Sequence, residues 1–373
     1  MWQLPGPSAF LDDIVDHLAS GTTLLIGTPV GFDVAALRGH VAHSFSGHRV
    51  ISISAAECNR AVPTAAWILD VLGVGRSDRG SDSIDDLIAL DDVSGSVLWI
   101  DGFTDDDEHR DAWRELALDW SRAVRRCDQL GAPVLVLCAS GGSALDLALD
   151  EPGMAVVYWW GRLHRIDIDL HLHLEARRHS AIHRAVSAEI AQFDPDLALL
   201  LAESQWSSLT ELSQILSDVG ERPAPDMHLR EAEEAVPLRH GPAWARGSVD
   251  RYDNQRRPAI HACCFIGDQE ELRQRQWGGQ VRTILPSLEA MRRRVVERAL
   301  AEGYITRSTS AGEFDFGPLA FHISAGRADR DRRRLGDFAH KLRIARNSLA
   351  HLDPVELSQY DRIVDSAREL GLT

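Results

Sequence analysis

A glycine-rich stretch near the N-terminus has residue types suited to phosphate chemistry. It runs from Gly21 to Asp33 and reads G-T-T-L-L-I-G-T-P-V-G-F-D. An apolar run ends at Gly27, a second glycine follows at Gly31, and a helical pattern begins near Val34. A strand, a glycine turn and a helix N-terminus form a layout whose backbone N–H groups can cradle phosphates. Gly27 and Gly31 are therefore candidates for binding a nucleotide cofactor.

The side chains that such a loop needs are absent. A functional loop reads G-x-x-x-x-G-K-[ST], with a Lys for the phosphates and a hydroxyl for magnesium. Here Phe32 and Asp33 occupy those two positions, and Lys341 is the only lysine in the chain. The Asp33 carboxylate would also repel a phosphate. The sequence therefore predicts a degenerate site without a cofactor, at which ATP and Mg²⁺ are disfavoured.

A second set of reactive side chains lies near the C-terminus, in the stretch R-N-S-L-A-H-L-D-P-V-E. Arg346 and Asn347 fall at the end of a helix predicted over about 333–350. Asp353, followed by a proline, predicts the start of another helix, which places His351 in a tight turn between the two. A His at a helix end can have a structural role, because its ring can bond to the last carbonyl groups. Structural and catalytic interpretations both stay open on the residues alone.

The elements that must position these residues follow an alternating pattern. Five short apolar, β-rich runs occur at 22–27, 49–54, 96–101, 133–138 and 155–160. Helical patterns lie between them at 34–46, 63–73, 109–130 and 143–150. Strands that alternate with helices imply a parallel sheet with helices on both faces, so we expect an α/β fold.

This order is similar to the core of AAA or STAND-type P-loop NTPases. The third apolar run, ending at Asp101, resembles a Walker B strand, whose final Asp can hold magnesium. The next residue is Gly102, where ATP-hydrolysing members usually place an acidic base. The fourth run resembles the strand that carries the sensor residue, here Ser140. The resemblance implies that Asp101 and Ser140 belong to the same degenerate nucleotide site as the two glycines.

The segment Ile166–Glu175 alternates apolar and polar residues strictly, which predicts a strand. Asp167, Asp169, His171 and His173 would then share one face. Their types could form a metal cluster, but a solvated strand face, or the first turns of a helix, accounts for them more simply. We therefore expect no metal site.

Four regions follow from these patterns. Residues 1–175 form the degenerate P-loop NTPase-like domain, and 176–219 form a helical middle with a boundary near Asp194-Pro195. Residues 220–267 are proline-rich with few periodic apolar positions, which predicts a linker or arm. Residues 268–373 are again helical, so an all-α C-terminal domain is expected.

Charge is distributed unevenly along the chain. The whole sequence has 40 basic and 56 acidic residues, a net charge of −16, which on average disfavours nucleic-acid binding. Residues 251–349 nevertheless contain 19 Lys and Arg against 12 Asp and Glu. One helix face there carries Arg292, Arg293, Arg294 and Arg298. It is either a solvated basic face or a surface for phosphate or RNA.

The R-N-x-x-A-H-x-x-P stretch resembles the C-terminal motif of HEPN-type helical domains, many of which are metal-independent ribonucleases. The resemblance implies that Arg346 neutralises a phosphate, His351 is the general acid–base, and Asn347 helps to orient them. It also implies that such a site forms across a dimer. P-loop modules joined to HEPN-like ends resemble parts of bacterial conflict and anti-phage systems.

Composition narrows the setting. No apolar run is long enough for a membrane span, and the N-terminus lacks the pattern of a secretory signal. The five cysteines form no C-x-x-C pair, so neither a zinc site nor a disulfide framework is expected. A cytoplasmic protein is the resulting expectation.

Two functions from different classes are consistent with these observations. The first is a non-hydrolysing P-loop-fold switch or scaffold that binds protein partners or forms a homo-oligomer, in a defence or signalling system. The second is a metal-independent ribonuclease that uses Arg346 and His351, with RNA bound by the basic C-terminal region. An ATP-dependent AAA/STAND regulator is a more distant alternative. On balance the sequence favours a protein that is not an enzyme.

Overall fold

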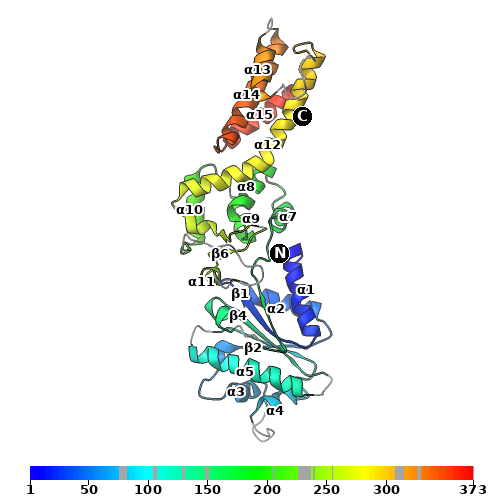
Figure 1. The fold of residues 1–373 in the computed structure, drawn as a ribbon, viewed down its shortest axis with the longest axis vertical. Helices are drawn as coiled ribbons and strands as arrows, with labels where there is room; N and C mark the ends of the chain where they lie inside the picture. Colours follow the sequence, from blue (N-terminus) through cyan, green and yellow to red (C-terminus); the bar gives the residue numbers. More distant parts are fainter. Residues whose placement is uncertain are drawn as a thin grey trace. The chain divides into compact units, whose positions relative to one another are not determined.

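The computed structural model describes residues 1–74, 82–103, 107–127, 131–147, 151–204, 206–225, 237, 240–253, 255–306, 315–325 and 329–372. The chain forms two compact units. Unit 1 comprises Met1–Asp167 and Arg222–Cys264, and unit 2 comprises Ile168–Glu221 and Phe265–Thr373. The chain therefore leaves unit 1, begins unit 2, and returns to unit 1 before it completes unit 2 (Figure 1).

Unit 1 is built on a five-stranded sheet. Its strands are β1 (Thr23–Thr28), β2 (Val50–Ser54), β3 (Val97–Asp101), β4 (Val134–Ser140) and β5 (Met154–Tyr158). They pair in the order β2-β3-β4-β1-β5, and every pair is parallel. All six residues of β1 are buried, as expected for a central strand covered on both faces. The predicted α/β class and all five predicted strands are confirmed.

Helices cover the sheet in two groups (Figure 1). Helix α1 (Pro5–Ala19) contacts β1, β5 and α2 (Val34–Ser44). Helix α5 (Asp107–Arg126) contacts β1, β4, α3 (Thr64–Val71) and α4 (Ile84–Ile88). A short helix, α6 (Gly142–Asp146), follows β4. The four predicted helices are present, whereas α1 and α4 were not predicted.

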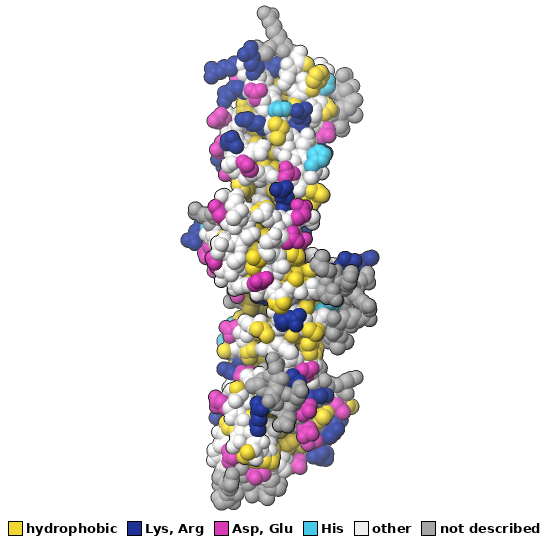
Figure 2. All heavy atoms as spheres, turned by 90° about the vertical axis from the view of Figure 1, so that its left-hand side faces the viewer, with side chains coloured by type: hydrophobic (Ala, Val, Ile, Leu, Met, Phe, Trp, Pro, Cys, Tyr) yellow, Lys and Arg dark blue, Asp and Glu magenta, His cyan; other side chains and the backbone are white. Residues whose placement is uncertain are grey.

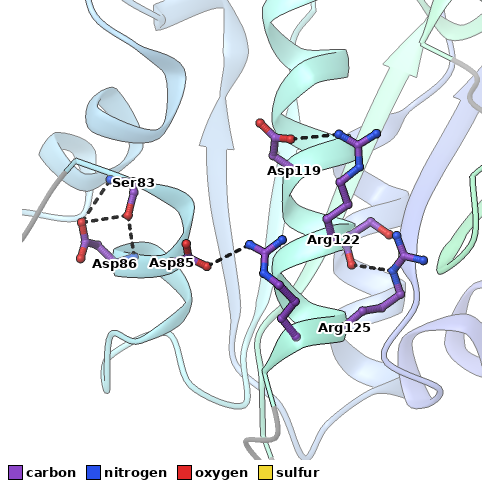
Figure 3. A network of polar contacts seen from close by, with 8 residues as sticks. Ser83, Asp85, Asp86, Asp119, Arg122 and Arg125 are labelled. Atoms are coloured by element: carbon purple, nitrogen blue, oxygen red, sulfur yellow. Dashed lines mark hydrogen bonds and ion pairs between the residues drawn. The ribbon is translucent and has the colours of Figure 1, made fainter.

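A capping box starts α4, and an exposed ion pair joins α4 to α5 (Figure 3). Ser83 and Asp86 form a reciprocal capping box that starts α4. Arg126 at the end of α5 pairs with Asp85 at 3.4 Å between nitrogen and oxygen. Both partners are mostly exposed, so this ion pair adds little to stability. The capping box does more, because it satisfies backbone groups at the start of a short helix.

The returning segment of unit 1 falls within the region predicted as a linker or arm. It contains α11 (Gly241–Ala245) and a two-stranded antiparallel ladder of β6 (Val249–Asp250) and β7 (Ala259–Ile260). Helix α11 packs against α6, and Trp244 is fully buried with its ring 5.6 Å from that of Tyr158. We call residues 240–253 the strap. It is a packed part of unit 1.

The strand predicted over Ile166–Glu175 is wrong, and the alternative of helical turns is confirmed: the segment forms helix α7 (Arg165–Glu175). Residues two apart on a helix point about 200° from each other, so strict alternation gives a helix two apolar faces. Ile168 and Leu172 are buried, whereas Leu170 and Leu174 are exposed.

The four acidic and His residues of this segment therefore do not share one face. Asp167 is buried and accepts hydrogen bonds from the backbone N–H groups of Gly6 and His164 at 3.0 and 2.8 Å. Within the described part of the chain, no group of three His, Cys, Asp or Glu side chains could hold a metal ion.

Unit 2 consists of helices in its described residues. They are the C-terminal part of α7, then α8 (Ala181–Ala191), α9 (Pro195–Glu203), α10 (Leu209–Val219), α12 (Gln269–Ala301), α13 (Phe316–Ser324), α14 (Arg330–Ala350) and α15 (Leu357–Glu369). The predicted all-α C-terminal region is confirmed. Helix α12 contains Pro286 and changes direction along its length in Figure 1, as expected where a proline removes a helix hydrogen bond.

Two predicted helix boundaries in unit 2 can be compared with the structure. The boundary at Asp194-Pro195 is confirmed, because Asp194 caps α9 by accepting from the N–H of Leu197 at 2.8 Å. The predicted helix start at Asp353 is wrong, because α15 begins at Leu357 with Glu356 at its N-cap. Residues 353–355 are held instead by α12, as described below.

None of the described helices has both the length and the apolar character to cross a membrane.

Candidate functional site

The topology of the sheet places a candidate site at the carboxyl ends of β1 and β4. These strands are neighbours, but the chain leaves β1 toward β2 at one edge and leaves β4 toward β5 at the other. Open parallel sheets bind ligands at such a switch point. Thr28 at the end of β1 and Ser140 at the end of β4 lie in register, with their hydroxyl oxygens 2.7 Å apart. The hydroxyl of Ser140, which the sequence indicated as a candidate site residue, is therefore hydrogen-bonded to the hydroxyl of Thr28.

The glycine loop, residues 27–33, connects β1 to α2. Gly27 has no room for a side chain, because a Cβ there would lie 2.4 Å from the Tyr158 ring. Gly31 has φ +84°, in the left-handed region that favours glycine. The loop N–H of Val30 donates to the carbonyl oxygen of Ala245 in the strap at 2.8 Å. A backbone oxygen from the strap therefore takes a donor that could otherwise bind an anion.

The N-terminus of α2 already has an anion. The Asp33 carboxylate accepts a hydrogen bond from the N–H of Ala36 at 2.8 Å, so this residue is the helix N-cap. A phosphate at the same helix end would meet this negative charge at close range. The predicted repulsion between the Asp33 carboxylate and a phosphate would therefore act at the N-terminus of α2.

Aromatic side chains pack the loop against unit 1. The Phe32 ring lies 4.8 Å from the Trp159 ring and 5.9 Å from the Trp2 ring. Phe10 of α1 contacts Trp159 from the inside, with 5.0 Å between ring centroids. Aromatic pairs at these distances stabilise a fold beyond their area burial. The loop is thus ordered by the chain's own side chains.

Asp101 at the end of β3 has a cation of its own. Arg38 of α2 contacts its carboxylate at 2.7 Å and the Ser52 hydroxyl of β2 at 2.6 Å. The Trp99 indole N–H also donates to the Asp101 carboxylate at 3.2 Å. The guanidinium supplies the positive charge that a metal ion would bring to this carboxylate.

Cys138 lies beside this pair on β4 and is buried. Burial raises the pKa of its thiol, and the Asp101 carboxylate raises it further, while Arg38 lowers it by a smaller amount. The thiol therefore stays protonated at neutral pH. Because the thiolate is the nucleophilic form, Cys138 is a core residue rather than a nucleophile.

The strap contains a buried acid that helps to hold it in place. Asp250 accepts hydrogen bonds from the N–H groups of Gly161 and Arg251 at 2.8 and 2.7 Å. Burial raises the pKa of this carboxyl to about 8, although the two hydrogen bonds lower it in part. Asp250 therefore changes charge near neutral pH while it anchors the strap to the end of β5.

The sequence predicted Gly27, Gly31, Asp101 and Ser140 as one site, but not the groups that occupy it. Thr28 and Ser140 meet directly, and Asp101 is bound by Arg38. The roles of Arg38 and of the Ala245 carbonyl depend on contacts between residues far apart in the chain. A basic residue on the helix after the glycine loop was the only available signal for Arg38.

The C-terminal candidates lie at the end of α14. His351 is the C-cap, and both His351 and Asn347 are exposed, with Arg346 half-buried. No described residue forms a hydrogen bond or ion pair with any of these three side chains. The two bonds that the structural interpretation named, from the His351 ring to helix-end carbonyls and from Arg346 to a carboxylate, are thus not seen among the described residues, and the role of these side chains stays a prediction.

The basic face of α12 has mostly structural partners. Arg294 and Arg298 donate to the carbonyl oxygens of Leu372 and Leu370 beyond the end of α15, at 2.7 and 2.5 Å. Arg292 pairs with Glu289 at 2.8 Å. On the face in Figure 2, Lys and Arg side chains over the C-terminal helices are interspersed with Asp and Glu. Arg293 and Arg294 are exposed and Arg298 is half-buried, so a solvated face and an RNA surface both stay predictions for this side of the helix.

Each unit also contains a pocket lined by described residues. In unit 1, a pocket of about 350 Å³ is lined by Cys58, Arg60 and Thr64 together with His109 and Glu115 of α5. In unit 2, a pocket of about 440 Å³ lies between the starts of α10 and α15. Arg273 of α12 lines it, 3.9 Å from the Asp353 carboxylate.

Comparisons with known proteins add little to this description. No protein-family model matches the chain, and no curated protein matches it. Among solved structures, it is similar to the RuvB Holliday junction branch migration motor of Thermotoga maritima, at 12% identity and a TM-score of 0.29. That similarity covers 56% of this chain and 62% of that chain. The fold assigned above rests on strand order and pairing.

Proposed function

We propose that this protein is a non-hydrolysing switch or scaffold with a P-loop NTPase-like core, which binds protein partners or a second copy of itself. One observation carries the proposal: groups of the chain itself occupy the positions that would serve a nucleotide. The Ala245 carbonyl accepts a hydrogen bond from the loop N–H of Val30, and the Asp33 carboxylate caps the start of α2. Arg38 forms an ion pair with Asp101. A bacterial defence or signalling system in the cytoplasm is the proposed setting.

These contacts bear on catalysis as well as on binding. Phosphoryl transfer requires donors and a metal ion aimed at the transferred group. A nucleotide entering this loop would have to break the Val30–Ala245 bond and overcome the Asp33 charge, with no Lys to compensate. Nucleotide affinity and turnover are therefore both expected to be negligible, and no cofactor is required.

Calorimetry with the full-length protein tests this proposal. ATP, ADP and GTP, each with and without Mg²⁺, should give no binding heat at about 100 µM ligand. A dissociation constant above that concentration corresponds to a binding free energy weaker than about 5 kcal/mol. Extracts of the purified protein should contain no nucleotide. Micromolar ATP affinity that is lost in Asp101→Ala would overturn the proposal.

A second candidate function is a metal-independent ribonuclease. It is favoured by the absence of partners for Arg346, Asn347 and His351 within the described residues. In this function Arg346 neutralises the phosphate, His351 transfers the proton and Asn347 helps to orient them. The two candidates are compatible in one chain, because the glycine loop and the C-terminal motif belong to different units.

RNA cleavage in the presence of a chelator tests the second candidate. His351→Ala should lower cleavage about 10²–10⁴-fold, the usual effect of removing a general acid–base. Its melting temperature should stay at the wild-type value, because His351 is exposed. Wild-type protein that leaves RNA intact under these conditions would exclude this function.

A further inference from the structure

The turn that carries His351 is tied to α12 at both ends. We call residues 351–356, between α14 and α15, the His351 turn. Before it, the Trp277 indole N–H donates to the Leu349 carbonyl at 2.7 Å. Within it, the Gln280 amide donates to the Val355 carbonyl and accepts from the Val355 N–H, both at 2.8 Å. Gln280 is fully buried, so these two bonds are shielded from water.

The backbone of the turn is closed by its own hydrogen bonds. The N–H of Asp353 donates to the Ser348 carbonyl at 2.9 Å, and the N–H of Leu352 donates to the Leu349 carbonyl at 3.4 Å. This is the pattern of a Schellman motif, with Leu352 at the position that normally holds glycine. Leu352 has φ +62° and is 58% exposed. A non-glycine residue keeps such a conformation only where its surroundings enforce it.

The polar side chains left over at this helix end include hydrogen-bond donors. Nearby N–H donors occupy the carbonyl groups of Asn347, Ser348 and Leu349. The side chains of Arg346, Asn347 and His351 therefore do not serve the helix end. A rigid, buried support beneath unused polar side chains is the arrangement that a binding site requires.

We propose that Trp277 and Gln280 are positioning residues that hold the His351 turn in one conformation, so that Arg346, Asn347 and His351 can bind an RNA phosphodiester. The proposal deepens the second candidate function, and its ligand rests on that function. The support of the turn rests on the hydrogen bonds alone. The two claims can therefore be tested separately.

Hydrogen exchange of the full-length protein tests the support. In Gln280→Ala, the amides of Leu352, Asp353 and Val355 should exchange at least about tenfold faster than in wild type. Trp277→Phe keeps a ring but removes the N–H, and it should accelerate the same amides. Gln274→Ala is the matched control, because Gln274 is exposed on the same helix and its hydrogen bond among the described residues is to Glu270, at 3.4 Å. It should leave the turn unchanged.

Gln280→Glu separates hydrogen bonding from packing. The carboxylate can still accept from the Val355 N–H, but it faces the Val355 carbonyl without a proton to donate. Protection of the turn should be lost at pH 8 and regained at a pH where the new carboxyl is protonated. Wild-type exchange at these amides in both Gln280→Ala and Trp277→Phe would overturn the positioning role, and so would protection in Gln280→Glu that does not change with pH.

RNA cleavage with a single-stranded oligonucleotide and chelator tests the ligand. Gln280→Ala should lower kcat/KM about 10-fold or more, because misplaced groups lose the benefit of orientation, whereas Gln274→Ala should match wild type. If wild type neither binds nor cleaves the oligonucleotide, the second candidate function and the RNA ligand both fail. Exchange data then decide the positioning role alone. Full cleavage by a Gln280→Ala variant with a disordered turn would show that positioning does not matter.

Discussion

The glycine loop and the His351 turn differ in whether their polar side chains have partners within the described part of the chain. At the loop, the strap carbonyl of Ala245, the Asp33 carboxylate and the Arg38 guanidinium take the positions that a ligand would fill. At the turn, the backbone is fully bonded but Arg346 and His351 have no partner in the described part of the chain. In unit 1 the polar groups around the loop are therefore paired within the chain, whereas in unit 2 the polar side chains at the turn are not paired with any described residue.

The strap provides the largest expected effect, through Asp250. Its folded pKa of about 8 lies above the ordinary value of 3.8, so the folded state holds this proton between those two pH values. Asp250 therefore stabilises the fold fully below about pH 4, and this contribution is lost as pH rises through about 8. Asp250→Asn keeps the acceptor and cannot ionise. Relative to wild type, it should gain several kcal/mol of unfolding free energy between pH 5 and 9.

Urea unfolding of both proteins at pH 5, 7 and 9 measures this difference. The free-energy gap between variant and wild type should widen from pH 5 to about pH 8 and then level off, because above pH 8 Asp250 is ionised in both states. A gap that is constant with pH would mean that Asp250 ionises at its ordinary pKa and that the strap is not pH-sensitive.

Filling the space at Gly27 should have the next largest effect. A Cβ there would meet the Tyr158 ring, which is buried, so Gly27→Ala should cost about 1–3 kcal/mol as overpacking. Gly39→Ala is the control, because Gly39 lies within α2 with open space around it and should gain about 0.5–1 kcal/mol. Chemical denaturation measures both. Equal stability of the two variants would contradict the tight packing behind the loop.

Removing the internal cation tests the pairing at Asp101. Arg38→Ala leaves a partly buried carboxylate without its partner and should cost about 1–3 kcal/mol. Arg122→Ala removes an exposed partner of Asp119 and should change stability by less than about 0.5 kcal/mol. Added Mg²⁺ should raise the melting temperature of Arg38→Ala only, if the guanidinium stands in for a metal ion.

Relieving strain in the His351 turn should produce a smaller, stabilising effect. Leu352 pays about 1–2 kcal/mol for its left-handed conformation, so Leu352→Gly should gain about 1 kcal/mol after its added freedom in the unfolded state is counted. Thermal unfolding measures the gain. A destabilised variant would show that the exposed Leu352 side chain makes contacts that stabilise the fold.

The smallest effect is expected at His351 itself. An exposed side chain without a hydrogen-bond partner should change stability by less than about 0.5 kcal/mol when replaced by Ala. Calorimetric melting of His351→Ala against wild type measures this. A loss above about 1 kcal/mol would place a structural bond at His351 and remove the contrast between the two regions.

Sequence periodicity predicted the parallel sheet well, because buried central strands such as β1 and β4 are continuous apolar runs. It failed at α7, where Ile168 and Leu172 bury one face while Leu170 and Leu174 expose another, so the period of two belongs to a helix. Helix α1 had a usable signal, since Phe10, Ile14 and Leu18 recur at helical spacing and are buried.

The candidate sites divide in the same way. Local motifs located Gly27, Asp101 and the His351 turn, because each follows from residues close together in sequence. The contacts that decide their chemistry are tertiary: Arg38 reaches Asp101, and Gln280 reaches Val355. No local pattern specifies such a pair, and a backbone carbonyl such as that of Ala245 has no sequence signal at all.

The route of the chain also determines the order in which the glycine loop and the strap are synthesised. The Val30 N–H bonds to a carbonyl that is translated about 200 residues later, which takes about 10–40 s at about 5–20 residues per second. Once β5 has been translated, the sheet of unit 1 is complete in sequence, but its loop still lacks the strap. The helices that begin unit 2 are translated before the strap. A nascent chain stopped before Ala245 would therefore present the glycine loop without its internal partner, a state that the finished protein does not show.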